Sequence, residues 1–115
     1  GTLEGADLSG SNLADAKLTT ANLGRAKLSE ARLAGADLYG ANLEGADLRG
    51  ADLRGTDLRR SKLAQADLRG ADLRGADLRE ADLFGADFRD ADLREANLEM
   101  TAFGGQRFCD YINVA

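Results

Sequence analysis

Apolar residues recur at every fifth position along almost the whole chain. We call the central apolar residue of each five-residue unit the hub. Hubs occupy Leu3, Leu8, Leu13 and every fifth position to Leu98, followed by Phe103 and Phe108. Two positions before each hub stands a small residue, which from Ala6 to Thr101 is always Ala, Ser or Thr. The position between them is mostly Asp or Asn, and the second position after the hub is often Gly.

A five-residue period excludes the common regular structures. In an α-helix, where each residue turns by about 100°, successive hubs would spiral around the axis, and a heptad coiled coil fails for the same reason. A flat strand would point successive hubs to opposite faces, because its side chains alternate. The chain must therefore turn once in each unit, with Gly helping it around the corner. Short strands joined by regular corners form a solenoid, with hubs and small residues inside.

The unit Ala66-Asp67-Leu68-Arg69-Gly70 shows the motif A(D/N)LXX, which resembles that of the pentapeptide-repeat family over about residues 1–108. The resemblance implies an all-β fold, a right-handed quadrilateral parallel β-helix with four pentapeptides per coil and about five coils. It also implies that the hubs fill the axis while the small residues line the crowded wall. We expect the β-helix to cover residues 1–103 and a separate C-terminal segment to cover 104–115.

The repeat breaks near the C-terminus, where Gly104-Gly105 interrupts the pattern. An open solenoid end exposes backbone and apolar side chains, so we expect these residues to cover it. The apolar residues available are Phe103, Phe108, Tyr111, Ile112 and Val114. The alternatives are a simple lid, a dimer contact, which resemblance to dimeric family members favours, and the start of a following segment. Because residue 1 is Gly and not Met, we expect the chain to be a piece of a longer protein.

The sequence lacks the residues that the usual catalytic sites require. The 115 residues include no His and a single cysteine, Cys109, so a Ser-His-Asp triad, a Cys-His pair and a Cys or His zinc site are excluded. We therefore expect no enzyme, no cofactor and no metal site. The net charge of −5 disfavours nucleic-acid binding through a basic patch. The sequence shows neither a long apolar run nor a signal segment, which favours a cytoplasmic location over export.

If residues 20 apart stack in neighbouring coils, the outward charges form columns. The Arg columns are Arg49/Arg69/Arg89, Arg54/Arg74/Arg94 and Arg59/Arg79. The Asp columns are Asp47/Asp67/Asp87, Asp52/Asp72/Asp92 and Asp37/Asp57/Asp77. Like charges about 4.8 Å apart repel, but each Arg column has an Asp column beside it. We expect a solvated surface with weak ion pairs, each worth about 0–1 kcal/mol.

The fourth face lacks an Arg column. Its outward positions include Asn22, Asn42, Lys62, Asp82, Glu4, Gly24, Glu44, Ala64 and Phe84. Specific function is expected where the repeat is broken, so the candidate interaction surface consists of Tyr39, Arg60, Lys62 and Phe84. The candidate cap or dimer contact consists of Phe103, Phe108, Tyr111 and Ile112.

Two function hypotheses remain. The first is a non-catalytic structural or protein-interaction module with an unidentified protein partner. The second, implied by the family resemblance, is a DNA-mimicking inhibitor or protector of DNA gyrase, as in quinolone resistance. Acidic charge favours mimicry, but residues 46–100 carry 13 acidic and 10 basic side chains, a net of only −3. Ice binding would require Thr-rich faces with little charge, and a homodimer through a solenoid end is a further alternative.

Overall fold

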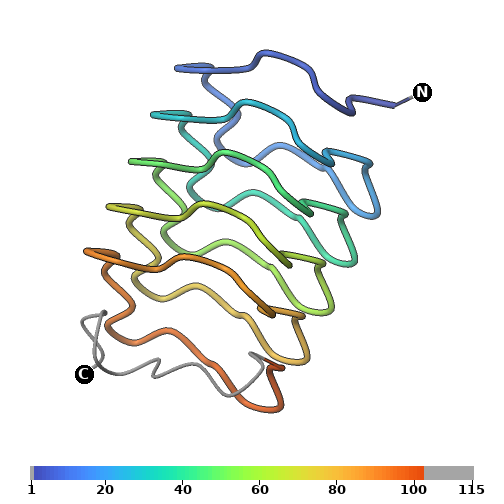
Figure 1. The fold of residues 1–115 in the computed structure, drawn as a ribbon. Helices are drawn as coiled ribbons and strands as arrows, with labels where there is room; N and C mark the ends of the chain where they lie inside the picture. Colours follow the sequence, from blue (N-terminus) through green and yellow to red (C-terminus); the bar gives the residue numbers. More distant parts are fainter. Residues whose placement is uncertain (1, 103–115) are drawn as a thin grey trace.

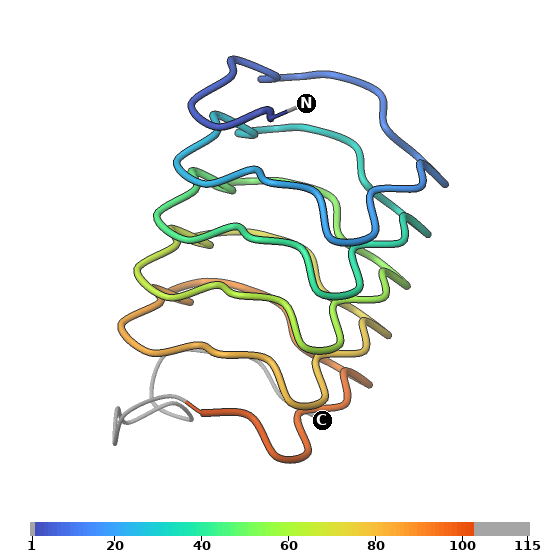
Figure 2. The same cartoon turned by 90° about the vertical axis from the view of Figure 1, so that its right-hand side faces the viewer.

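The computed structural model describes residues 2–102. Over this range the chain winds into a stack of similar coils, with its first part (blue) at one end and its last part (red) at the other (Figure 1, Figure 2). These residues contain no helix, hence none that could cross a membrane, and no continuous strand; isolated bridges and two-residue turns replace them. The predicted all-β parallel solenoid is confirmed. We expected a short strand in each unit, but each unit contributes at most a single bridged residue. The turn occupies two of the five positions, which leaves too few residues for a longer strand.

Pairing between coils has a fixed register. Every bridge is parallel and joins residues 20 apart, from Asp7–Lys27 to Asp82–Ala102. The backbone bonds follow the same register: the Leu48 N–H donates to the Asp67 carbonyl at 2.7 Å, and the Asp67 N–H donates to the Ala46 carbonyl at 2.9 Å. Two bridged residues are therefore four five-residue units apart along the chain. Equivalent side chains therefore stand above one another in columns.

Each unit ends in a tight turn at the two residues after the hub. The Ala71 N–H donates to the carbonyl of the hub Leu68 at 3.0 Å, which closes the turn. The second turn residue has positive φ in every unit from residue 5 to residue 100, as a type II turn requires. Glycine is not obligatory there, since Thr20 and Arg60 both adopt a φ of 58°. The corner lies where the sequence predicted it, and non-glycine residues tolerate it.

The core is a stack of leucines lined by small residues. Hubs from Leu23 to Leu93 are almost fully buried, Phe88 included, and the alanines from Ala26 to Ala91 are buried as well. Burying one leucine side chain contributes about 1.5–3 kcal/mol relative to leaving it in water. Burial decreases toward the first described coil, where Leu3 is 38% exposed.

Two hydroxyl residues replace alanine in this core. The Thr56 hydroxyl donates to the Leu53 carbonyl at 2.9 Å, so its burial leaves no unsatisfied donor. The Ser61 hydroxyl is equally buried but has no hydrogen-bond partner. A buried unpaired hydroxyl is destabilising, because its bonds to water are lost without replacement.

The expected cap lies outside the described residues. Its candidate residues are Phe103, Phe108, Tyr111 and Ile112. The division at residue 103 therefore stays a prediction.

Candidate interaction surface

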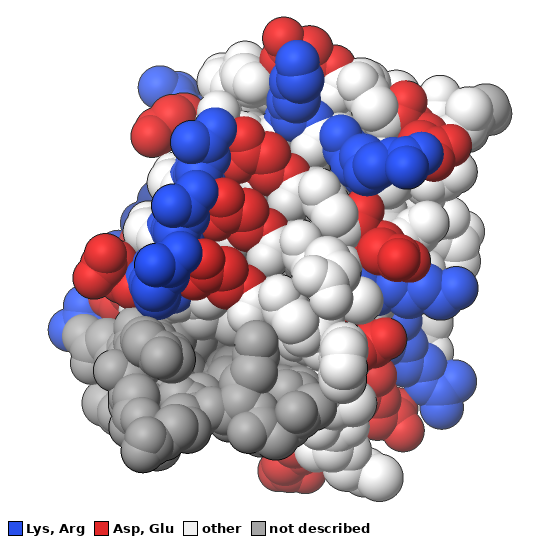
Figure 3. Space-filling model, viewed as in Figure 1, with Lys and Arg blue, Asp and Glu red and all other residues white. Residues whose placement is uncertain are grey.

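The outward side chains divide into four walls, each a stack of equivalent units. The first, second and third arginine walls contain the hub sets Leu48/Leu68/Phe88, Leu53/Leu73/Leu93 and Leu58/Leu78/Leu98. The mixed wall contains the hubs Leu3, Leu23, Leu43, Leu63 and Leu83. Figure 3 shows a Lys/Arg column in contact with an Asp/Glu column on the left, and an uncharged strip that separates them from the charged side chains on the right.

On the arginine walls, each arginine that directly follows a hub forms a two-pronged ion pair, a fork, with the aspartate two residues before it. Arg49 Nε donates to Asp47 Oδ1 at 2.8 Å, and Arg49 Nη2 donates to Asp47 Oδ2 at 2.7 Å. The same fork forms at Arg54, Arg59, Arg69, Arg74, Arg79, Arg89 and Arg94. Arg49 Nε also lies 3.9 Å from Asp67 Oδ2 of the next coil. These contacts offset the repulsion within each column.

The Asp or Asn before the hub has a second role that was not predicted from the sequence. Asp67 Oδ1 accepts the backbone N–H of Arg69 at 3.2 Å, and Asn22 Oδ1 accepts that of Gly24 at 3.1 Å. Side chains of these two types commonly bond the backbone two residues on and so stabilise a turn. The signal was present in the sequence as a preference for Asp and Asn over other polar residues. A lysine at this position, such as Lys62, lacks the acceptor.

The forks keep both partners charged at neutral pH. The hydrogen bond from Arg69 is the main cause that lowers the pKa of Asp67, and the bond from Arg94 lowers the pKa of Asp92 to about 2. The same contacts raise the arginine pKa values, as Asp67 does for Arg69. A general acid or base works best with a pKa near the operating pH. These carboxylates are therefore poorly suited to proton transfer near neutrality.

Two predicted site residues lie at the corner before the mixed wall. The half-buried Tyr39 packs its ring against Arg59, whose Cζ is 5.1 Å from the ring centre. Exposed Arg60 places Nε 3.0 Å from Glu80 Oε2, and its pKa is raised chiefly by that carboxylate. Tyr39 lies 20 residues before Arg59 in the third arginine wall. Because residues 20 apart stack in neighbouring coils, the two side chains come close together. Both residues thus have intramolecular partners.

The other two predicted residues lie together on the mixed wall. Phe84 is 56% exposed, and its backbone N–H donates to Asp82 Oδ1 at 3.0 Å. Asp82 is bridged to Lys62 of the preceding coil, which places Lys62 and Phe84 in adjacent layers. Lys62 is exposed and forms no ion pair with any residue in 2–102.

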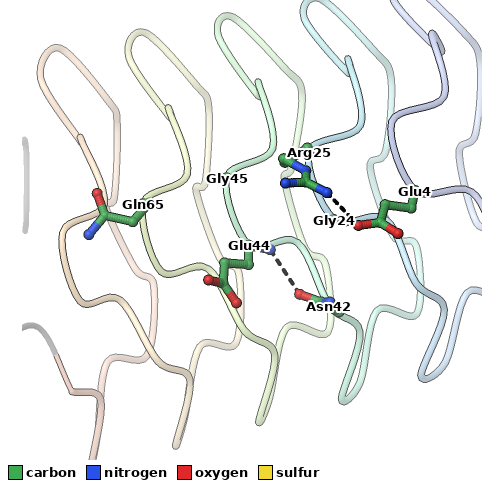
Figure 4. A pocket seen from close by; sticks show the side chains of 7 residues that line it. All are labelled: Glu4, Gly24, Arg25, Asn42, Glu44, Gly45 and Gln65. Carbon is green, nitrogen blue, oxygen red and sulfur yellow. Dashed lines mark hydrogen bonds and ion pairs between the residues drawn. The ribbon is translucent and has the colours of Figure 1, made fainter.

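A shallow hollow of about 270 Å³ indents the mixed wall (Figure 4). Its lining consists of Glu4, Gly24, Arg25, Asn42, Glu44, Gly45 and Gln65. Arg25 Nη2 points at Glu4 Oε2, 2.8 Å away. The only sign of this hollow in the sequence is that Gly24 and Gly45, which lack side chains, stand next to the longer side chains of Arg25 and Glu44. No group of described residues is arranged to hold a metal ion.

Comparison with known proteins yields one family and several related structures. A family model described as Pentapeptide repeats matches eight copies over residues 2–25, 26–63 and 61–99. Among curated proteins, no sequence matches the chain.

The related structures differ in likeness. Rfr23, a pentapeptide repeat protein from the cyanobacterium Cyanothece 51142, is 29% identical with a TM-score of 0.77, over 95% of this chain and 87% of that one. The pentapeptide repeat protein alr5209 from Nostoc PCC 7120 is 32% identical with a TM-score of 0.51, over 99% and 84% of the two chains. QnrB1, a plasmid-mediated fluoroquinolone resistance protein, is 15% identical with a TM-score of 0.53, over 90% of this chain and 62% of that one. The likeness to QnrB1 is one of fold alone.

Proposed function

Because this chain belongs to the pentapeptide-repeat family, we propose that it is a non-catalytic structural or protein-interaction module that docks through its mixed wall. The observation that carries this proposal is the contrast in pairing between walls. On the other three walls, each arginine that directly follows a hub forms a fork, as Arg74 does with Asp72. On the mixed wall, Phe84 is 56% exposed and Lys62 forms no ion pair with a described residue.

An exposed aromatic beside an unpaired cation defines the chemistry of a partner. Aromatic residues are enriched at protein interfaces and act as anchors when a pocket receives them. The expected partner is therefore a protein with an apolar pocket for Phe84 and a carboxylate for Lys62. Tyr39 and Arg60, at the neighbouring corner, belong to the rim of this surface.

A non-catalytic role has support from the surface chemistry. The fork carboxylates have lowered pKa values, Asp67 and Asp92 among them, which opposes acid–base catalysis at neutral pH. Proteins of this family generally serve as structural or interaction modules.

For the fold itself we infer a right-handed quadrilateral coil of four pentapeptides, repeated about five times. Support comes from the constant register of the bridges, which spans four units. Handedness follows from family membership.

The alternative, a DNA-mimicking inhibitor or protector of DNA gyrase, has weaker support. The shared fold with QnrB1 and the Asp columns favour it. The forks oppose it, because they neutralise surfaces that a DNA mimic should keep negative. A gyrase supercoiling assay separates the two functions: inhibition or drug protection would favour mimicry over the module.

Differential capture tests the proposed docking surface. Immobilised wild-type chain, the mixed-wall variant Phe84→Ala/Lys62→Glu and the control Arg49→Gln/Arg69→Gln are exposed to the same cell extract. We expect a protein that is retained by the wild type and the control but lost from the mixed-wall variant. A protein retained equally by all three would contradict docking through the mixed wall. Tyr39→Ala measures the contribution of the rim.

A further inference from the structure

The second arginine wall presents two parallel stripes of opposite charge. One stripe is Asp52/Asp72/Asp92 and the other is Arg54/Arg74/Arg94. Successive charges in each stripe are separated by the coil spacing, about 4.8 Å. Any second copy of the chain has the same stripes with the same spacing.

The forks leave part of each guanidinium unused. Arg74 donates from Nε to Asp72 Oδ1 at 2.9 Å and from Nη2 to Asp72 Oδ2 at 2.6 Å. A guanidinium has five N–H donors, so the two on Nη1 remain available for a carboxylate outside the coil. The side chains of Arg54, Arg74 and Arg94 are 52%, 46% and 47% exposed. An external carboxylate can therefore bind them without breaking the forks.

The edges of this wall are open to approach in the coil of Gly70 and Gly75, while Asp90 and Glu95 occupy the same turn columns one coil later. Its bordering turn columns include Gly55, Gly70 and Gly75, and a side-chain carbon placed at any of the three would meet no atom within 4 Å. The third arginine wall shares the corner of Gly55 and Gly75 but has the longer side chains of Arg60 and Glu80 along its other edge. The second arginine wall is thus the better suited of these two to a flat neighbour.

We propose that a second copy of this chain docks on the second arginine wall, with the two copies related by a two-fold axis parallel to the coil stack. Rotation about that axis exchanges the two sides of the wall but keeps every residue at its height. Each Asp stripe then faces the Arg stripe of the other copy, in matching register, and the same patch is used twice. Copies related by an axis across the stack would place like charges opposite each other, which is repulsive.

This contact is expected to be weak and sensitive to salt. The wall is narrow, so the interface belongs with the small ones that bury less than about 1,200 Å². Exposed charge pairs are screened as ionic strength rises. The proposal is independent of the proposed function, because it concerns a different wall and a different partner.

Sedimentation equilibrium of the full chain tests the proposal at about 20 mM and about 500 mM NaCl, conditions that differ strongly in screening length. We expect reversible dimers at low salt and monomers at high salt. Arg54→Glu/Arg74→Glu/Arg94→Glu should raise the Kd at least about tenfold more than the control Arg49→Glu/Arg69→Glu/Arg89→Glu. The control makes the same change in net charge on the first arginine wall.

Three results would overturn the proposal. They are a wild-type chain that stays monomeric at millimolar concentration in low salt, association that persists in high salt, and equal weakening by the two triple variants. If circular dichroism shows that the triple variant does not fold, Arg74→Glu replaces it, with Arg69→Glu as control. A Kd unchanged by Arg74→Glu relative to Arg69→Glu would then contradict docking on this wall.

Discussion

The first and later parts of the solenoid have the same backbone conformation but differ in the ion pairs on their surface. Within residues 2–45, as far as the structure describes ion pairs, opposite charges meet only at Arg25 and Glu4. From residue 46 onward, eight Asp–Arg forks cover the arginine walls. The parallel register of the bridges runs unchanged through both parts. Hub, small residue and turn therefore determine the coil, while the forks act on its surface.

The largest difference should appear in the core. Leu68→Ala removes a fully buried hub in the later part and is expected to lower the unfolding free energy by about 2–5 kcal/mol. Leu3→Ala changes a hub that is 38% exposed and should cost less than half as much. Urea denaturation followed by circular dichroism measures both. Equal losses would show that the first coil is as tightly packed as the middle.

Acid should weaken the later part through its forks. The pKa values of the fork carboxylates are lowered, that of Asp92 to about 2, while in the unfolded chain they return to about 3.9. Their stabilisation is therefore present above pH 4 and is lost as the pH falls toward 2. The Tm is expected to drop by about 10 °C or more between pH 7 and pH 2.5.

A variant without the forks of one wall measures how much they contribute to the acid sensitivity. Arg54→Gln/Arg74→Gln/Arg94→Gln removes one wall's forks, so the drop in Tm on acidification should be smaller than in the wild type. An unchanged drop would assign the acid sensitivity to other groups. Differential scanning calorimetry at both pH values gives the result.

The two core hydroxyls should respond in opposite directions. Ser61→Ala removes a buried hydroxyl without a partner and is expected to stabilise the fold by about 1–2 kcal/mol. Thr56→Val deletes the bond to the Leu53 carbonyl and should destabilise it by about 1 kcal/mol. Chemical denaturation of the two variants provides the test. A loss of stability in Ser61→Ala would mean that the hydroxyl has a partner in solution.

The smallest effects are expected at the turns. Thr20→Gly relieves a β-branched residue at a φ of 58° and should stabilise the first part by up to about 1 kcal/mol. Gly55→Ala introduces backbone strain at a φ of 61° without a steric clash and should cost about 1 kcal/mol. Thermal unfolding measures both; a Thr20→Gly variant less stable than the wild type would contradict the strain argument.

Much of this fold follows from the period of five. The period identified the buried hubs, such as Leu68, and the corner after each hub, because only a chain that turns once per unit can bury every leucine. It could not show that the Thr56 hydroxyl has a hydrogen-bond partner and the Ser61 hydroxyl has none, since this depends on side-chain rotation within the coil. It placed Tyr39 one coil before Arg59 but did not indicate that the ring packs on the guanidinium, which depends on side-chain rotation. The hollow on the mixed wall depends on side-chain directions that no repeat pattern encodes.

We propose that the mixed wall binds a protein partner, while the forked arginines of the other walls take no part in that contact. Isothermal titration calorimetry with the captured partner tests this most directly, using the wild type, Phe84→Ala and Arg49→Gln/Arg69→Gln. We predict that Phe84→Ala weakens binding at least about tenfold and that the arginine variant stays within about twofold of the wild type. Undiminished affinity in Phe84→Ala, together with a loss in the arginine variant, would contradict the account.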